Sequence, residues 1–244
     1  MAKSKSSVTF PTITEAKCRR VLEVVDQGLI DGVGDPEPGK MCVEAAVCFA
    51  LGEPHGDHPL CVHPRVREAK IVLNDDTAWG DSISRAIGLR RLAIAQLGTA
   101  AKTFDVDEFT RLARNLVTKT MLPKKILDFA YGDSVTLEAF EELAKKVEKH
   151  GLEALPLVLL MTDDCNQDAK YLGTSLFNGE DWINEVRFIF EAELVDFCEQ
   201  LVQILVQMKT PGSKFLYLTD QIKPPKKIKK TKTSTKIKPK KKAG

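Results

Sequence analysis

The sequence lacks any apolar run long enough to cross a membrane. Its richest apolar stretch, LPLVLLM at 155–161, is much shorter than the roughly 18 to 20 apolar residues that a membrane-spanning helix needs. No apolar segment follows the opening MAKSKSSVTFPT, so we also expect no secretory signal. These absences predict a soluble protein of the cytoplasm, or of the nucleus in a nucleated cell, without a membrane partner.

The sequence also lacks the regular cysteine spacing of a disulfide framework. Its six cysteines are scattered along the chain, at Cys18, Cys42, Cys48, Cys61, Cys165 and Cys198. In a chain without a secretory signal, cysteines of this kind are expected to be reduced. The cysteine pattern therefore agrees with a cytoplasmic location.

Acidic residues are missing from the C-terminal end of the chain. Residues 223–244 contain eleven lysines and no Asp or Glu. The formal net charge of +2 therefore hides a division, because the other 222 residues hold 25 Lys and Arg against 34 Asp and Glu, a net charge of −9. The sequence predicts an acidic body joined to a cationic tail.

We call residues 221–244 the tail, and we expect it to be disordered. It has almost no side chain that could build a core, and it combines three prolines with dense like charge. A lysine laid against phosphate releases condensed cations, which predicts salt-sensitive and sequence-independent binding to nucleic acid or another polyanion. The candidate nucleic-acid-binding residues are Lys223, Lys226, Lys227, Lys229, Lys230, Lys232, Lys236, Lys238, Lys240, Lys241 and Lys242.

In composition the tail resembles the lysine-rich tails of linker histones and of histone-like bacterial proteins. The resemblance covers about a tenth of the chain and implies association with nucleic acid. Arginine and aromatic residues are absent from the tail, so neither base-edge reading nor stacking is expected. Three other roles stay open: nuclear import, a solvated tail, and contact with an anionic membrane. The last is disfavoured because no amphipathic helix or lipidation motif accompanies the lysines.

The body of the chain has predominantly helical periodicity. Apolar residues at three- and four-residue steps, together with capping residues, glycines and prolines, mark where helices begin and end. We expect an all-α fold of packed helices with no required sheet, although the segment at 155–162 and the segment KFLYLT near Leu216 could each be a strand. The expected helices lie near 12–29, 41–51, 64–74, 82–98, 105–117, 126–129, 137–147, 155–162 and 180–209.

The expected helix at 180–209 is long and amphipathic. Its apolar seam alternates steps of three and four residues, the spacing by which coiled-coil helices keep one face against a partner. The seam residues are Ile183, Val186, Phe190, Leu194, Phe197, Leu201, Ile204 and Met208. Further apolar residues widen the stripe, so we favour packing within the chain's own bundle over a homodimer through 183–208.

Histidine is scarce, yet three of the four histidines lie together in the run GEPHGDHPLCVHP. We treat His55, His58, Cys61 and His63 as candidate metal ligands, because imidazole and thiolate are the donors that zinc prefers. Their order does not match an established zinc-ligand spacing, and three prolines stiffen the loop. The alternative is that the imidazoles cap helix ends and bond to the backbone, which makes zinc a possible rather than an expected cofactor.

Cys42 is a candidate nucleophile. It follows Gly39 and Lys40 at the expected start of a buried helix, where the helix N-terminus and a nearby cation would favour the thiolate. His55 or His58, folded back from the next loop, could act as its base. A cysteine in an apolar helix is more often a small buried side chain, so this hypothesis ranks below a structural role.

These features predict a flexible N-terminus at 1–11, a helical half at 12–98 with the histidine loop, a second half at 105–220, and the tail. We expect a non-enzymatic protein whose tail binds nucleic acid or another polyanion and whose body serves assembly or partner binding. The alternative is a cysteine- or metal-dependent hydrolase centred on Cys42 and the loop from His55 to His63.

Overall fold

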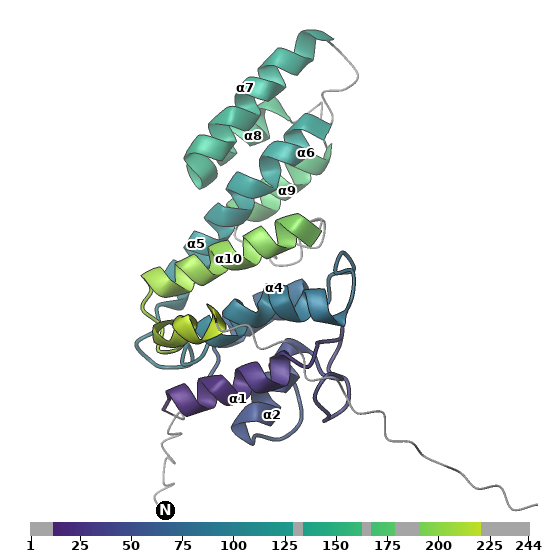
Figure 1. Ribbon diagram of the computed structural model, residues 1–244. Coiled ribbons are helices and arrows are strands. Elements are labelled where there is room, and N and C mark those ends of the chain that lie inside the picture. The colour runs from purple at the N-terminus through teal and green to yellow at the C-terminus, as the bar shows by residue number, and fades with distance from the viewer. Residues whose placement is uncertain (1–11, 129–133, 163–166, 179–190, 221–244) are drawn as a thin grey trace, which may run out of the picture.

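The computed structural model describes residues 12–128, 134–162, 167–178 and 191–220. Over these ranges the chain is helical, which confirms the all-α fold, and its β-structure is confined to one isolated antiparallel bridge between Gly34 and Met41. No helix within the described ranges is long and apolar enough to span a membrane. The molecule is elongated, with α1 to α4 at one end, α6 to α9 at the other, and α5 and α10 between them (Figure 1).

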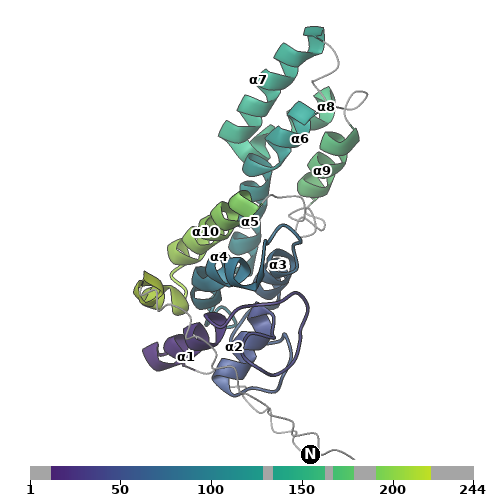
Figure 2. The same cartoon turned by 45° about the vertical axis from the view of Figure 1, so that its right-hand side comes forward.

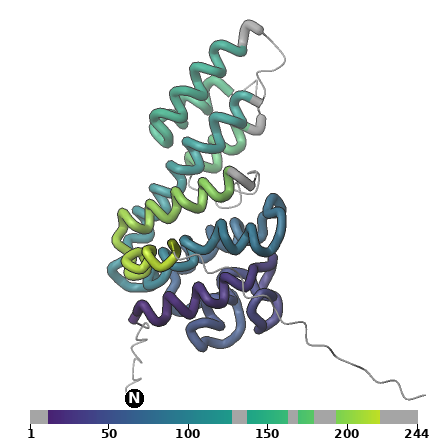
Figure 3. Tube along the Cα trace, viewed as in Figure 1, coloured from purple at the N-terminus to yellow at the C-terminus, as the bar shows by residue number. Residues whose placement is uncertain are grey.

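The elements follow one another in a simple order along the chain. They are α1 (Glu15–Val25), α2 (Val43–Leu51), α3 (Pro64–Asn74), α4 (Ser82–Ala95), α5 (Val106–Thr120), α6 (Leu122–Asp128), α7 (Ser134–His150), the 3-10 helix η2 (Gly151–Ala154), α8 (Leu155–Met161), α9 (Gln167–Asn178), α10 (Glu191–Gln207) and the 3-10 helix η4 (Gly212–Asp220). The path of the chain through them can be followed in Figure 3.

Local capping explains where several helices begin. Asp81 accepts hydrogen bonds from the backbone N of Ile83 and of Ser84, at 2.9 and 2.7 Å, and so caps α4. α3 begins at Pro64 because a proline in the first turn loses no helical hydrogen bond. Asp105 caps α5 in the same way as Asp81 caps α4. These starts agree with the sequence prediction.

α10 and η4 return to the first part of the chain. α10 packs along α4 and α5, and η4 packs on α4 and α1 (Figure 2). Buried apolar side chains form a connected cluster that extends from α1 through to η4. The division into halves at 12–98 and 105–220 stays a prediction, but the end of the second half contributes to the core of the first.

Trp79 explains the glycine in the middle of α4. Its ring is buried, and Nε1 donates a hydrogen bond to the carbonyl of Leu73 at 2.7 Å. A Cβ at Gly88 would lie 2.4 Å from the Trp79 ring, so only glycine allows this close approach. The indole therefore anchors the loop before α4 in the core.

Some elements differ from the sequence prediction. α1 ends at Val25 rather than near Leu29, because Gly28 takes a φ of +109° and turns the chain. The segment near Leu216 is part of the 3-10 helix η4 and not a strand, and α9 was not predicted. The segment at 155–162 forms α8, as we favoured.

Parts of the prediction lie outside the described residues. These are the N-terminus at 1–11, the tail at 221–244, and the beginning of the expected helix at 180–209. The described part of that helix is α10, and Lys209, with a φ of +56°, follows its end.

Candidate functional site

The histidine loop between α2 and α3 is held against the end of α4 by backbone contacts. The carbonyl of Cys61 accepts hydrogen bonds from the backbone N of Gly98 and of Ala100, at 3.0 and 3.1 Å. The backbone N of His63 donates to Thr99 Oγ1 at 2.9 Å. These bonds fix the path of the loop without using an imidazole.

The structure does not bring the four candidate metal ligands together. His55 Nε2 lies 2.9 Å from the carbonyl oxygen of Gly34, and His58 contacts Asp57 at the surface. Cys61 is buried, whereas His55 and His58 are exposed. Within the described ranges, no three His, Cys, Asp or Glu side chains are grouped so that they could hold a metal ion.

His63 has the capping role that we considered as the alternative to metal binding. Its Nδ1 accepts a hydrogen bond from the backbone N of Arg65 at 3.2 Å, at the start of α3. Burial lowers the pKa of His63, which favours the neutral ring that this bond requires. The ring also packs against Phe104, with 5.9 Å between the ring centroids.

Cys42 lies where the sequence placed it, at the start of α2, but it serves there as a buried cap. Its Sγ accepts a hydrogen bond from the backbone N of Ala45 at 3.3 Å, and 4% of the residue is exposed. Burial raises its pKa, and this effect outweighs the bonds from the helix amides and the attraction of Lys70, which lower it. The expected nearby cation Lys40 instead pairs with Glu37 at 2.8 Å.

Burial also keeps the other described cysteines in the thiol form. It raises the pKa of Cys18, Cys48 and Cys198 to about 12 and that of Cys61 to about 11. All the cysteines of the described ranges are buried and free. They therefore behave as small core side chains rather than as nucleophiles at neutral pH.

Beside Cys42, α2, α3 and α4 enclose a polar cluster of Glu44, Lys70 and Gln96. Lys70 Nζ lies 3.1 Å from Glu44 Oε1, and Gln96 Nε2 donates to Glu44 Oε2 at 3.2 Å. All three residues are fully buried. Inside the core, Glu44 of α2 thus contacts both Lys70 of α3 and Gln96, the residue that follows α4.

Burial governs the ionisation of both charged members. It raises the pKa of Glu44 to about 7, because the loss of water outweighs the attraction of Lys70 and Arg67. It lowers the pKa of Lys70 for the same reason, although Glu44 opposes the shift. Such shifts are common in active sites, but groups that are fully enclosed cannot reach an outside substrate. The cluster can fix the positions of the three helices.

Asn74 ties the loop between α1 and α2 to the end of α3. Its Oδ1 accepts from the backbone N of Val43 at 3.0 Å, and its Nδ2 donates to the carbonyl of Ile30 at 2.8 Å. The neighbouring Asp75 accepts from the backbone N of Gly32 at 3.0 Å. These bonds set the loop that leads into α2, and so the position of Cys42 and Glu44.

The sequence contained a signal for the buried cluster that our prediction did not use. Glu44 is a charged residue within the otherwise apolar run MCVEAAVCFAL. Lys70 lies between Ala69 and Leu73 on the apolar face of α3. A charged residue on an apolar face often has an opposite charge as its partner in the core.

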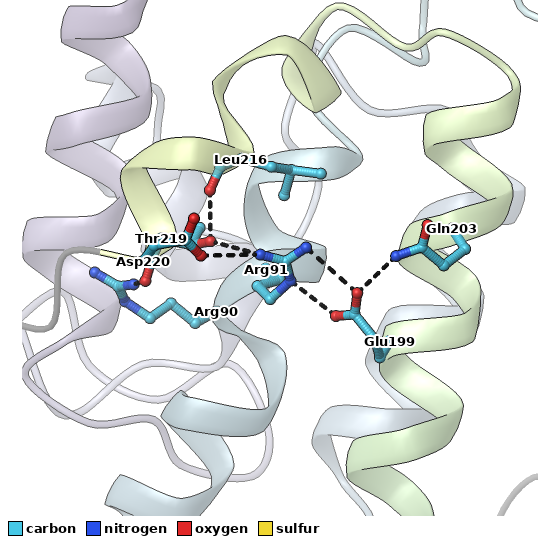
Figure 4. Close-up of polar contacts among 7 residues, drawn as sticks. All are labelled: Arg90, Arg91, Glu199, Gln203, Leu216, Thr219 and Asp220. Carbon is cyan, nitrogen blue, oxygen red and sulfur yellow. Dashed lines mark hydrogen bonds and ion pairs between the residues drawn. The ribbon is translucent and has the colours of Figure 1, made fainter.

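Two adjacent arginines on α4 fasten the last described residues to the body (Figure 4). Arg91 Nε donates to Glu199 Oε2 of α10 at 2.8 Å, and its Nη1 donates to Thr219 Oγ1 at 3.0 Å. Arg90 Nε pairs with Asp26 at 2.6 Å and also donates to the carbonyl of Thr219 through Nη1. η4 is thereby held against α1, α4 and α10.

The tail begins directly after this arginine junction. The side chain of Asp220, the last described residue, is 74% exposed and lies 3.4 Å from Arg91 Nη1. All eleven candidate lysines, from Lys223 to Lys242, lie outside the described residues. The described structure therefore gives the point on the body from which the tail continues.

Comparisons with protein-family models, with curated proteins and with solved structures find no match to this chain.

Proposed function

We propose that the protein associates with nucleic acid, or with another polyanion of similar charge density, through the lysines of its tail. The observation that carries this proposal is the segregation of charge along the sequence. Eleven lysines without an acidic residue follow a body with a net charge of −9. Phosphate binding is then confined to the tail, because the body as a whole repels polyanions.

The arginine junction supports this division of roles. Asp220 is exposed and η4 is fastened to three helices, so the tail continues from a fixed place on the surface of the body. A cationic segment attached in this way brings whatever the body binds close to nucleic acid. The body serves assembly or partner binding in this proposal.

The surroundings of Cys42, His55 and His58 are less favourable to the hydrolase hypothesis than to the proposal above. Cys42 is a buried helix cap with a raised pKa, and the imidazoles of His55 and His58 are engaged elsewhere. A nucleophilic cysteine needs an accessible thiolate and a base within hydrogen-bond reach. Measurement of iodoacetamide labelling at each cysteine, with metal analysis of the purified protein, tests the hydrolase hypothesis directly.

Binding of a fluorescent duplex DNA and of an RNA of equal length tests the proposal. The full chain should bind both without sequence preference, and a chain ending at residue 222 should lose most of the affinity. The logarithm of the binding constant should fall with the logarithm of salt concentration, by about 0.9 for each duplex phosphate contacted.

Two tail variants provide matched controls. Replacement of all eleven lysines by arginine keeps the charge and should retain salt-dependent binding, whereas replacement by glutamine should abolish it. Circular dichroism must show that each variant keeps the helical body. Equal affinity of the full and shortened chains, or binding that does not depend on salt, would contradict the proposal.

A further inference from the structure

In the buried cluster of Glu44, Lys70 and Gln96, some polar atoms lack hydrogen-bond partners. Lys70 Nζ, Glu44 Oε1 and Gln96 Oε1 are buried atoms that have no hydrogen-bond partner among the described residues. Lys70 Nζ and Glu44 Oε1 form an ion pair at 3.1 Å, but the angles between them are not those of a hydrogen bond, and the other hydrogens of the ammonium group have no acceptor among the described residues. Each unmet polar group in a core costs about 1 to 3 kcal/mol.

These three atoms require a group with a particular hydrogen-bonding capacity. The amine of Lys70 is a donor, so the missing group must accept from it. When Glu44 is ionised, its oxygens and the amide oxygen of Gln96 are all acceptors, so the same group must donate twice. A cation would be repelled by the ammonium and an anion by the carboxylate, whereas a water molecule accepts and donates in this combination.

The surrounding contacts favour a single small molecule. The other Glu44 oxygen, Oε2, already accepts from Gln96 Nε2 at 3.2 Å, so the amide of Gln96 is oriented by the carboxylate. The amide oxygen of Gln96 is therefore its free end. All three residues have no exposed surface, which leaves no route for bulk solvent to satisfy them.

We propose that α2, α3 and α4 enclose one internal water molecule that accepts from Lys70 Nζ and donates to Glu44 Oε1 and Gln96 Oε1. Three hydrogen bonds are typical of a buried water molecule in a protein. The water completes an interaction to which Glu44 of α2, Lys70 of α3 and Gln96, the C-cap residue of α4, each contribute one atom. This site is independent of the proposed role of the tail.

A crystal structure of the full chain at neutral pH, at a resolution that defines ordered water, tests the proposal. The expected result is a density peak within about 2.6 to 3.2 Å of all three atoms. A direct hydrogen bond between Lys70 and Gln96 with no such peak would overturn the proposal. A peak that contacts only one or two of the three atoms would also overturn it.

The variant Gln96→Leu tests the role of the amide oxygen. The peak should be lost or displaced, whereas it should persist in Thr99→Val, which removes a different, partly buried hydrogen bond shortly after the end of α4. Persistence of the peak in Gln96→Leu at its original position would show that the amide oxygen is not a ligand. If Gln96→Leu does not fold, the wild-type structure still decides the question.

Discussion

At Glu44 and Lys70, removal from water opposes the attraction between the charges. Both side chains are fully buried, and each is disfavoured in its charged form by burial. Desolvation of an ion pair in a core often cancels its Coulombic attraction, whereas the removal of one partner leaves an unpaired buried charge. The cluster is therefore better understood as fixing how α2, α3 and α4 fit together than as a source of net stability.

Paired substitution should be less harmful than single substitution. Lys70→Met should lower the free energy of unfolding by about 3 to 5 kcal/mol, because Glu44 stays buried without its partner. The double variant Glu44→Met with Lys70→Met should recover a large part of that loss. Urea denaturation of the two single variants and the double variant measures the coupling.

Lys40→Met is the matched control for this cycle, because its ion pair with Glu37 is exposed on both sides. Its effect should stay below about 1 kcal/mol. Strictly additive effects at Glu44 and Lys70 would show that the two side chains do not interact.

The raised pKa of Glu44 makes stability depend on pH with a defined sign. The pKa is about 7 in the folded protein and 4.5 for the ordinary group, so the folded state binds the proton more tightly. The contribution of Glu44 to stability is therefore full below pH 4.5 and is lost as the pH rises through 7. Between pH 5 and 7 the free energy of unfolding should fall by about 2 kcal/mol from this group.

Two measurements check this pH dependence. The carboxyl carbon of Glu44 should titrate with a midpoint near 7 in an NMR experiment on the wild-type protein, and urea denaturation should show the loss relative to Glu44→Gln. A midpoint below 4.5 would mean that the attraction of Lys70 outweighs burial, and the sign of the pH effect would then be reversed.

At the scale of the element, the packing of η4 on α4 depends on a glycine. The backbone N of Gly212 donates to the carbonyl of Leu97 at 2.9 Å, and a Cβ at Gly212 would lie 2.0 Å from the carbonyl oxygen of Ile94. Backbone atoms of α4 cannot move aside without disturbing the helix. η4 can therefore pack this closely on α4 only if residue 212 has no side chain.

Gly212→Ala should lower the free energy of unfolding by about 1 to 3 kcal/mol, because the added methyl group separates η4 from α4. Gly56→Ala is the control, since a Cβ at Gly56 would meet no atom within 4 Å. Its effect should stay within about 0.5 kcal/mol. Equal stability of the two variants in urea denaturation would contradict the close approach of η4 to α4.

The sequence predicted those elements whose boundaries are set locally. Asp81 and Pro64 mark the starts of α4 and α3 because their effects need only the neighbouring residues. η4 could not be predicted in this way, because Thr219 near its end is bound by Arg90 and Arg91, which are distant in the sequence. Tertiary contacts of this kind leave no periodic pattern.

The same limit applies to the candidate site. The sequence showed that His55, His58, Cys61 and His63 are close along the chain, but not that their side chains diverge. His55 contacts Gly34 and His58 contacts Asp57, whereas hydrogen bonds at Cys61 and His63 hold the loop against the end of α4. The charge of the tail, in contrast, follows from the sequence alone.

On the scale of the whole molecule, α10 packs through its apolar seam on α4 and α5, which come much earlier in the chain. Of its described members, Leu194, Phe197, Leu201 and Ile204 are buried against the chain's own helices and Met208 is half-buried. Ile183, Val186 and Phe190 lie outside the described residues. A homodimer through 183–208 stays a prediction, and within α10 it would have to use the exposed apolar face rather than this seam.

Lysine substitutions distinguish the two uses of α10. Phe197→Lys and Leu201→Lys should each lower the free energy of unfolding by more than about 4 kcal/mol, because a charge would enter the core between α10 and α4. Val195→Lys, at a position that is 43% exposed, should leave stability within about 0.5 kcal/mol. Thermal unfolding by circular dichroism and sedimentation equilibrium measure stability and mass for the same samples. If the wild type is a dimer and Leu201→Lys is a folded monomer, the seam faces another chain. If only Val195→Lys lowers the mass, the dimer contact lies on the exposed face.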